Sequence, residues 1–522
     1  MSKNLFLLLF LIVISGTVVA EDAPVEFESS QWRSSALDLR IIQVKKRLLE
    51  IVSEMLVNAH GDDGKQDLLD FRDKLVPTLV TNGDVDKNSI VLNGVFTDLR
   101  SALESEKYKT KKNPIFNRML ESFASALISE IEIREHVYKF PLQLGAYDFA
   151  SSRIKYEKIK SIKDVFDLLE TELSTTLKSL NENISKSPDL GAPSLFASLY
   201  SQASSNGLDA IFDPIMQGNY PYKRMVLKNK GEESICLHLA TPTIRSNESV
   251  EITPEFLAHL RNLKMKGEHQ FYINFQKNGA PTAWELMKYF GIEYYRAQCL
   301  QGLNTVPELQ GVIDVMTLDK NSEFYWQNAK DAMEFVSLNS FWEELEQKLF
   351  CEACDSGFYW PEALKGKQRE IRGVLKQLKS VLYADGADSL NAQKRKDSIE
   401  LVYLFLMGKL SVGSKIINFS CKDDIDRGAG AKSLFLLATI LKEVIMNAEK
   451  FLDNPYLLQE RVEMLLSLVF ADALMAKQRP LLEERLQRFQ QAAVALVKSL
   501  RDNPEFFIFF RNNFSFDQVS FK

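Results

Sequence analysis

Residues 415–435 read KIINFSCKDDIDRGAGAKSLF, and this stretch decides how the C-terminal half of the chain is organised. Residues 415–420 form an apolar run that predicts a buried strand. From residue 431, apolar positions recur at helical spacing and predict a helix. The residues between are therefore expected to form a strand-to-helix loop. Such a loop directs several backbone N–H groups toward one point, and the helix N-terminus adds positive potential there, so we expect an anion site.

The side chains of this loop are those needed for phosphoryl transfer. A cysteine at the mouth of such a loop, Cys421, is expected to exist partly as the nucleophilic thiolate. Arg427 can bind two oxygens of a phosphate with its planar guanidinium. Gly428 and Gly430 would let the backbone turn closely around the ligand. Together they predict catalysis through a cysteinyl-phosphate intermediate.

The heptapeptide CKDDIDR has the C-x5-R form of the cysteine-dependent phosphatase superfamily. Within that superfamily it resembles the phosphoinositide 4-phosphatases and related bacterial inositol-phosphate phosphatase effectors, whose loop reads roughly CKSxKDRT. The resemblance implies that Cys421 is the nucleophile and Arg427 the phosphate clamp. It further implies that Lys422 faces the anionic head group and that Asp426 occupies the acidic position before the arginine.

The loop departs from this family at several positions. Gly428 stands where the family has Thr or Ser, so the hydroxyl that assists the leaving thiolate is missing, and Ile425 replaces a basic residue. Asp423 and Asp424 add negative charge. Catalysis is expected to survive if both aspartates point outward, whereas aspartates that cap the helix would fill the anion site. The alternatives are an inactive phosphatase-like loop, or a buried cysteine with Arg427 paired to a local aspartate.

The segment Trp360-Pro361-Glu362 is the candidate for the general acid. It resembles the mobile WPD loop of tyrosine phosphatases, with Glu362 in place of aspartate, and the implied role is to protonate the leaving oxygen. An aromatic residue followed by Pro-Glu is also a common helix start, with proline at the first position and glutamate in the first turn. Both interpretations are carried forward.

The N-terminus predicts export. Lys3 precedes the apolar run LFLLLFLIVISG, and Val18 and Ala20 fit a cleavage site before residue 21. Residues 1–20 are therefore expected to be a cleaved signal peptide rather than an uncleaved anchor. The mature protein should be secreted or periplasmic, with delivery to a host as a further expectation. The net charge of -6 and the lack of a basic arm give no support for nucleic-acid binding.

The chain is predicted to be α+β and largely helical, with a helical region over 21–204 and an α/β phosphatase-like domain with C-terminal helices over 205–522. Turn residues such as HGDDG and TNGD separate helical patterns in the first region, whose helices are candidates for contact with a protein partner. In the second region strands are expected at the ranges 222–231, 233–242, 269–276, 311–319 and 415–420, and a helix at 280–291. The tail 506–521 is expected to be a final strand or a docking segment.

The five cysteines are too few for a disulfide scaffold. Cys351 and Cys354 form a lone CxxC pair, interpreted as two partly buried thiols or a local disulfide, with a thiol redox protein as the weaker alternative. The histidines are scattered without an HExxH motif, so no metal and no cofactor are expected.

The sequence thus predicts an exported phosphatase acting on phosphoinositides or inositol phosphates, with peripheral membrane contact through a lipid substrate. The alternative is a catalytically inactive, phosphatase-like or all-helical interaction protein. Both remain open from the sequence.

Overall fold

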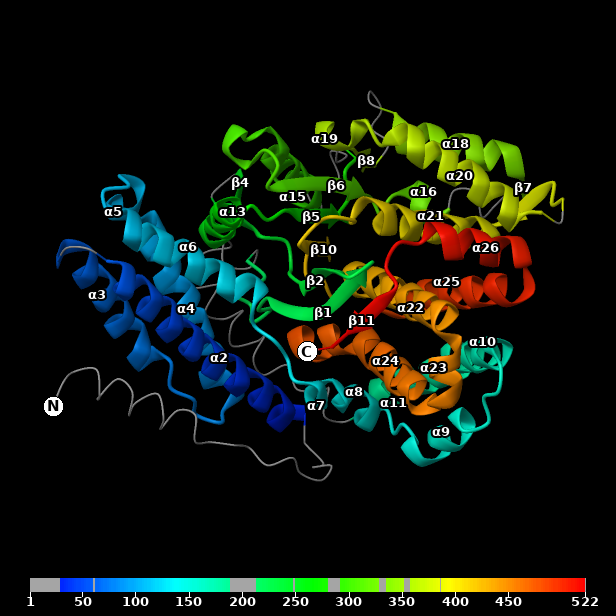
Figure 1. Ribbon diagram of the computed structural model, residues 1–522, viewed down its shortest axis with the longest axis horizontal. Helices are drawn as coiled ribbons and strands as arrows, with labels where there is room; N and C mark the ends of the chain where they lie inside the picture. Colours follow the sequence, from blue (N-terminus) through cyan, green and yellow to red (C-terminus); the bar gives the residue numbers. More distant parts are fainter. Residues whose placement is uncertain are drawn as a thin grey trace.

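The structure is a computed structural model. It describes residues 29–59, 62–187, 213–246, 249–279, 292–327, 335–351, 357–384 and 386–521. The predicted signal peptide and the helix expected at 280–291 lie outside the described residues. The described part is a mixed α/β protein with a helical N-terminal region and a sheet that begins at residue 222 (Figure 1).

The helical region agrees with the periodicity of its sequence. Its elements are α2 (Ser29–Asn58), α3 (Asp62–Thr78), α4 (Val85–Glu104), α5 (Glu106–Lys109), α6 (Pro114–Ser129), α7 (Glu135–Tyr138), α8 (Phe140–Leu144), α9 (Phe149–Tyr156), α10 (Ile162–Thr171), the π-helical turn η1 (Glu172–Thr176) and α11 (Leu177–Lys186). Polar side chains cap helix starts in this region. At the start of α4, for example, the side chain of Asp84 accepts hydrogen bonds from the N–H groups of Asp86 and Lys87.

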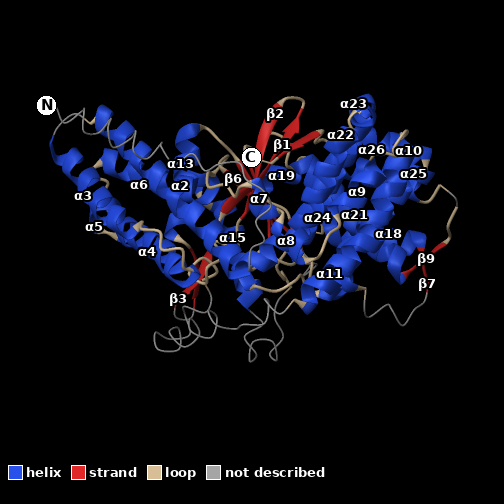
Figure 2. Ribbon diagram, turned by 90° about the horizontal axis from the view of Figure 1, so that it is seen from below, coloured by secondary structure: helices blue, strands red, loops and turns tan. Residues whose placement is uncertain are grey.

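The hydrophobic cores divide this region near residue 131. Helices α2 to α6 supply most of a second core, although Trp32 and Ala36 of α2 belong to the main core and Ile128 of α6 to a third core beside the sheet. Helices α7 to α11 instead share the main core with the C-terminal helices, and α8 packs on α24 while α10 packs on α25. Figures 1 and 2 show α2 to α6 as a separate arm beside the sheet. The division between the cores, near residue 131, therefore comes earlier in the chain than the domain boundary predicted at residue 204.

The main sheet has seven strands in the order β11-β1-β2-β10-β5-β6-β8. Its strands are β1 (Tyr222–Asn229), β2 (Glu232–His238), β5 (Gln270–Asn274), β6 (Ile313–Leu318), β8 (Phe358–Tyr359), β10 (Ile416–Ser420) and β11 (Gln518–Ser520). The four central strands β2, β10, β5 and β6 are parallel, and β10 pairs with both β2 and β5. Two small sheets pair β3 (Thr243–Ser246) with β4 (Ser249–Ile252), and β7 (Phe335–Ser337) with β9 (Ser389–Asn391).

Helices cover both faces of the sheet. They are α13 (Pro254–Lys266), α15 (Ile292–Gly302), η4 (Leu303–Thr305), η5 (Pro307–Leu309), α16 (Glu323–Trp326), α18 (Leu338–Phe350), α19 (Glu362–Lys365), α20 (Gln368–Leu382), α21 (Ala392–Leu410), α22 (Arg427–Met446), α23 (Ala448–Asp453), α24 (Pro455–Lys477), α25 (Glu483–Asp502) and α26 (Pro504–Asn513). On one face α6, α13 and α15 pack on alternate strand residues; on the other lie α21, α22, α24 and α25. This three-layer arrangement explains why all five residues of β10 are buried.

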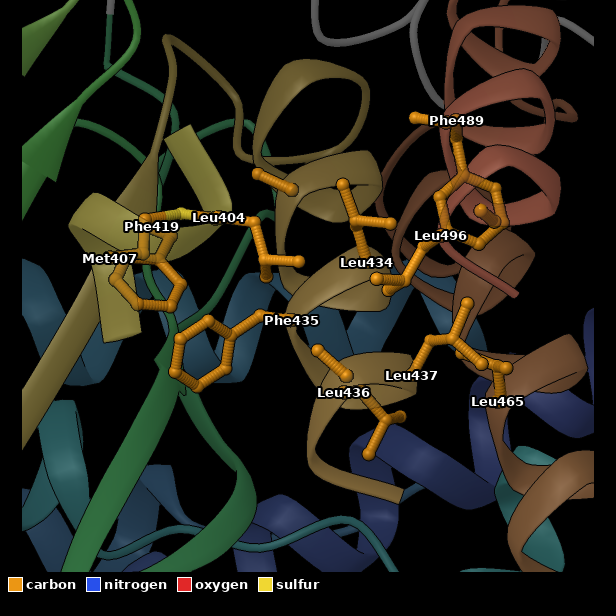
Figure 3. Packing of buried hydrophobic residues seen from close by; sticks show 14 of the residues in the cluster. Leu404, Met407, Phe419, Leu434, Phe435, Leu436, Leu437, Leu465, Phe489 and Leu496 are labelled. Carbon is orange, nitrogen blue, oxygen red and sulfur yellow. The ribbon is translucent and has the colours of Figure 1, made fainter. Parts of the chain in front are cut away.

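Helix α22 is the central helix of the main core. Leu434, Phe435 and Leu437 are fully or almost fully buried, as expected for a helix that is apolar on nearly all sides. Figure 3 shows its side chains between Phe419 of β10 and Phe489 of α25. The N-terminus of this helix is therefore fixed relative to the sheet by packing on several elements.

The strands predicted at five ranges are confirmed as β1, β2, β5, β6 and β10. In the C-terminal tail the predicted final strand is confirmed as β11 at the edge of the sheet, and the helix α26, which was not predicted, precedes it. The sequence analysis missed β8 and the two small sheets, which are short strands with weak alternation. Within the described residues, no helix combines the length and apolar character required to cross a membrane.

Candidate active site

Cys421 lies at the carboxyl edge of the sheet, directly after the central strand β10. Its side chain is a free thiol with 4% exposure. Residues 422–426 form the loop, and α22 begins at Arg427. The predicted strand, loop and helix are therefore confirmed. Ligands of α/β proteins bind outside the carboxyl ends of parallel strands, so the loop occupies the expected position for a binding site.

The backbone of this loop presents unpaired donors. Among the described residues, no acceptor receives a hydrogen bond from the N–H groups of residues 422–429; the first bond of α22 runs from Gly430 N–H to the Asp426 carbonyl (3.0 Å). Asp426 at the N-cap makes no capping hydrogen bond with its side chain. Asp424 has a φ of 58°, and such left-handed residues make successive N–H groups face a common concavity that binds anions.

Asp424 points into the protein rather than into the loop. Its carboxylate accepts hydrogen bonds from Leu239 N–H (3.0 Å) and from the ammonium of Lys432, and it is fully buried. Burial raises the pKa of Asp424 to about 7, and Asp472 adds to the rise while Lys432 opposes it. This aspartate therefore does not cap the helix or occupy the N–H groups.

The two glycines after the arginine have different environments. A Cβ at Gly428 would overlap the Asp424 carboxylate and lie 2.9 Å from the Phe419 carbonyl oxygen. The nearest atom to a Cβ at Gly430 is Phe489 Cβ at 3.9 Å, which is ordinary contact. Gly428 is thus required by the inward position of Asp424. The expectation that Gly430 is needed for a close turn is wrong, because this residue lies within α22 with room for a methyl group.

Arg427 is held by Glu293 at the start of α15. Its Nη1 donates to Glu293 Oε2 (2.9 Å) and to the Phe275 carbonyl (3.0 Å), and its Nη2 donates to Glu293 Oε1. Burial alone would raise the pKa of Glu293, but Arg427 outweighs it and lowers the pKa to about 2. The Nε–H of Arg427 donates to no acceptor in the described part of the chain and remains able to bind a phosphate oxygen.

The other loop side chains face different directions. Asp426 forms an ion pair with Arg479 (2.8 Å) and accepts a hydrogen bond from Leu482 N–H (3.3 Å). The Asp423 carboxylate lies 3.9 Å from Lys477, and its carbonyl accepts a hydrogen bond from the Asn219 amide. Lys422 is half-buried, and its carbonyl accepts a hydrogen bond from Thr241 N–H (3.0 Å). Neither the Asp423 nor the Asp426 carboxylate accepts a hydrogen bond from the described N–H groups of residues 422–429.

A pocket opens beside the loop, between α22 and α25. It is lined by Lys320, Tyr325, Glu400, Asp426, Arg427, Gly430, Leu434, Arg485, Arg488 and Phe489. Its four cationic side chains face two carboxylates, and both carboxylates already have partners. Glu400 accepts from Lys320 (2.6 Å) and Arg488 (3.2 Å), which lower its pKa to about 2 against the effect of burial. The pocket therefore carries excess positive charge next to the loop.

Arg485 contributes most of this available charge. It donates to the Lys320 carbonyl (2.8 Å) and to the side-chain oxygen of Asn321 (3.0 Å), and its guanidinium lies 4.3 Å from the Trp326 ring centroid. Neither acceptor is charged. Burial lowers the pKa of Arg485, and its interactions include Arg427 and Cys421. A second phosphate group in the pocket would find a cation here.

Two carboxyl groups are candidates for the proton donor. Glu362 begins α19, is 86% exposed and pairs with Lys365 (2.8 Å), so the helix-start interpretation of this segment is confirmed. Asp319 instead follows β6 at the same edge of the sheet as the loop and interacts electrostatically with Arg427. Burial raises the pKa of Asp319 to about 6, although the N–H groups of Asn278 (3.1 Å) and Asn321 (2.6 Å) donate to it.

The remaining cysteines differ in their covalent state. Cys236 and Cys299 are free thiols, and Cys351 is disulfide-bonded, while Cys354 lies outside the described residues. The local disulfide predicted as one alternative fits this state of Cys351. Within the described ranges, no group of three or more His, Cys, Asp or Glu side chains is placed to hold a metal ion.

The sequence analysis missed Glu293, Asp319 and Arg485. Each reaches the loop from an element distant in the sequence, and only the position of Asp319 directly after a predicted strand was a usable signal. In comparisons with protein-family models, curated proteins and solved structures, no match was found for this chain.

Proposed function

We propose that the chain is a cysteine-dependent phosphatase that hydrolyses phosphate monoesters of inositol lipids or inositol phosphates. The observation that carries the proposal is the run of unpaired N–H groups over 422–429, between the free thiol of Cys421 and the guanidinium of Arg427. Equatorial phosphate oxygens would accept from these N–H groups and from Arg427 Nε, as in other sites that stabilise developing negative charge.

The proposed reaction has two steps. The Cys421 thiolate attacks phosphorus, an S–P bond forms and the P–O bond to the alcohol breaks, while a carboxylic acid gives its proton to the leaving oxygen. Water then attacks phosphorus, the S–P bond breaks, and the thiolate and inorganic phosphate are released. The same carboxylate takes a proton from that water. Glu362 is the acid that the sequence resemblance implies. Asp319 is favoured by its burial at the sheet edge and its interaction with Arg427.

The substrate class is supported by charge. Arg485 lines the pocket next to Arg427 and would bind a further phosphate group on the same ring, while Lys320 and Arg488, which are held by Glu400, add positive potential. Lys422 at the mouth of the loop adds one more cation. Such a pocket favours a substrate with several phosphates over a simple alkyl phosphate. Contact with a membrane surface follows for a lipid substrate, while a soluble inositol phosphate requires none.

A second candidate function is supported by the ion pair between Glu293 and Arg427. A carboxylate already binds two nitrogens of the guanidinium, as a phosphate would. A chain in which this pair is permanent would be a phosphatase-like protein without activity, whose helices contact a protein partner. The two functions differ in whether phosphate can share Arg427 with Glu293.

The test is phosphate release by the mature protein under reducing conditions, with a panel of phosphoinositides, soluble inositol phosphates and an aryl phosphate. Cys421→Ser and Arg427→Met are expected to abolish release. Cys299→Ser, at a half-buried free thiol on α15, is the matched control and is expected to retain it. Absence of release from every substrate by the unchanged protein would leave the non-catalytic function.

A further inference from the structure

A second basic pocket lies where α2 meets the sheet and α24. Arg33 and Arg40 line it from α2, and it also includes Tyr220, Tyr222 and Asp472. The two arginines are seven residues apart, which places them on one face of the helix about 10 Å apart along its axis. Arg33 is 6% exposed and Arg40 is 4% exposed. Two guanidinium groups are thus buried at the junction between the helical arm and the sheet.

Neither arginine has an anionic partner at ion-pair distance among the described residues. No carboxylate lies within 4.0 Å of either guanidinium, and the buried Nε of Arg40 has no hydrogen-bond acceptor in that part of the chain. Arg40 instead lies over two tyrosine rings, 4.9 Å from the centroid of Tyr222 and 6.0 Å from that of Tyr220. Burial lowers the pKa of Arg33 to about 10, which still leaves the group charged at neutral pH. Buried charges without partners are costly.

The buried carboxylates of this region are already engaged, and the carboxylate that interacts electrostatically with Arg33, Asp86, is exposed. Asp472 accepts hydrogen bonds from Tyr222 and Arg224, and Asp424 accepts from Lys432. Arg33, Arg40, Arg224 and Lys432 therefore supply four positive charges against at most three negative charges, those of Asp472, Asp424 and Asp86. His238, which lies beside both aspartates, does not change the balance, because burial lowers its pKa to about 4. The cluster has an excess of at least one positive charge.

We propose that this pocket binds a phosphate group, as inorganic phosphate or a small phosphate ester, between Arg33 and Arg40. An anion would offset this excess charge, and each planar guanidinium can donate to two of its oxygens. The unpaired Nε of Arg40 supplies a donor that is already buried. The inference does not depend on catalysis by Cys421, since the pocket and the loop use different residues.

The pocket is connected to the loop through Asn219. This residue lines the pocket, its amide donates to the Asp423 carbonyl (2.6 Å), and its Oδ1 lies 2.7 Å from His238 Nε2. A phosphate in the pocket would hold α2 against the segment that carries Asn219. Occupancy is therefore expected to stabilise both the docking of the helical arm and the loop.

The experiment measures thermal unfolding of the mature protein in phosphate and in chloride at equal ionic strength. It uses the Arg427→Met background, in which the loop has lost its phosphate clamp. A ligand that binds only the folded state raises the unfolding midpoint, so phosphate should raise it in this background. Sulfate, with the same shape and charge, should also raise it, whereas chloride should not. Adding Arg33→Met and Arg40→Met should weaken phosphate binding by about tenfold or more, measured by calorimetric titration.

A third variant keeps the test decisive if the double variant fails to fold. Ala36 lines the pocket three residues after Arg33 and four before Arg40, so Ala36→Glu places a carboxylate between the two guanidiniums. It is expected to raise the unfolding midpoint in chloride relative to Ala36→Gln, which has the same size without the charge, and to remove the response to phosphate. Arg153→Met, at an arginine whose side chain is 63% exposed, is the control and should leave the response unchanged.

Three results would overturn the inference. The first is a phosphate response that disappears with Arg427→Met alone, which would assign all binding to the loop. The second is a response that persists unchanged in the variant lacking Arg33 and Arg40. The third is an unfolding midpoint in chloride that is lower for Ala36→Glu than for Ala36→Gln, which has the same size without the charge; this would show that the pocket rejects an anion.

Discussion

Alanine substitutions at Gly428 and Gly430 are predicted to have opposite effects on stability. A methyl group at Gly428 would overlap the Asp424 carboxylate and lie 2.9 Å from the Phe419 carbonyl oxygen, whereas at Gly430 its nearest neighbour is 3.9 Å away. Both residues lie in the first turn of the same helix, so the pair separates the steric effect from helix propensity.

The magnitudes follow from these environments. Gly430→Ala should increase the free energy of unfolding by roughly 0.5–1 kcal/mol, because alanine loses less conformational freedom than glycine in a helix. Gly428→Ala should decrease it by about 1–3 kcal/mol if the surroundings shift to admit the methyl group. The loss should approach roughly 3–5 kcal/mol if the Asp424 carboxylate is displaced from Lys432, since a buried ion pair would then be broken.

Denaturant unfolding followed by circular dichroism measures both values under one set of conditions. Opposite signs for the two variants are expected, with a difference of at least about 1.5 kcal/mol. Equal effects would refute the reasoning, because they would show that Asp424 does not occupy the space beside Gly428. In that case the aspartate would point toward the N–H groups of the loop and compete with phosphate.

Three further predictions concern the site. In the unchanged protein kcat/KM should fall above about pH 6, because Asp319, with its pKa raised to about 6, must be protonated to donate, and Asp319→Asn should remove this fall. Glu362→Gln should leave the pH profile unchanged. The reverse result would assign the role of proton donor to Glu362. Glu293 has a pKa lowered to about 2, so its contribution to the free energy of unfolding is full above about pH 4.5 and is lost as pH falls toward 2. Glu293→Gln should flatten the dependence of the free energy of unfolding on pH in this range. An unchanged dependence would contradict the ion pair with Arg427. Arg485→Met should raise KM for inositol substrates with several phosphates but not for an aryl phosphate, and equal changes for both would place Arg485 outside the substrate pocket.

The sequence was sufficient where local pattern decides structure. The buried strand 416–420, the loop after it and the helix that starts at Arg427 could all be predicted, because the apolar runs and the charged break between them lie within twenty-one consecutive residues. The central parallel strands were found for the same reason, since strands buried on both faces are continuous apolar runs.

The orientation of the loop side chains could not be predicted. Asp424 lies inward because two groups donate hydrogen bonds to its carboxylate. One is the ammonium of Lys432, in the second turn of α22, and the other is the N–H of Leu239, directly after the carboxyl end of β2. Glu293 reaches Arg427 from 134 residues away in the sequence. Such contacts depend on how distant elements pack, and neither composition nor periodicity records them.

The WPE segment shows how a motif can match while its surroundings differ. Trp360 is buried and donates to the Leu349 carbonyl (2.7 Å), which fixes the segment by packing, and Glu362 begins a short helix on the surface. The helix-start rule for Pro-Glu predicted this arrangement from local chemistry. The position of Asp319 after a central strand was an equally local signal, but it is shared by many structural aspartates.

The most direct test of the central claim is to trap the covalent intermediate. The mature protein is mixed with an inositol phosphate or aryl phosphate substrate that it turns over, quenched in acid within the first turnover, digested and analysed by mass spectrometry. We expect phosphate on the peptide that contains Cys421, and none on that peptide in Cys421→Ser. Phosphate release without any modified Cys421 peptide, or modification of a different residue, would contradict the assignment of this thiol as the nucleophile.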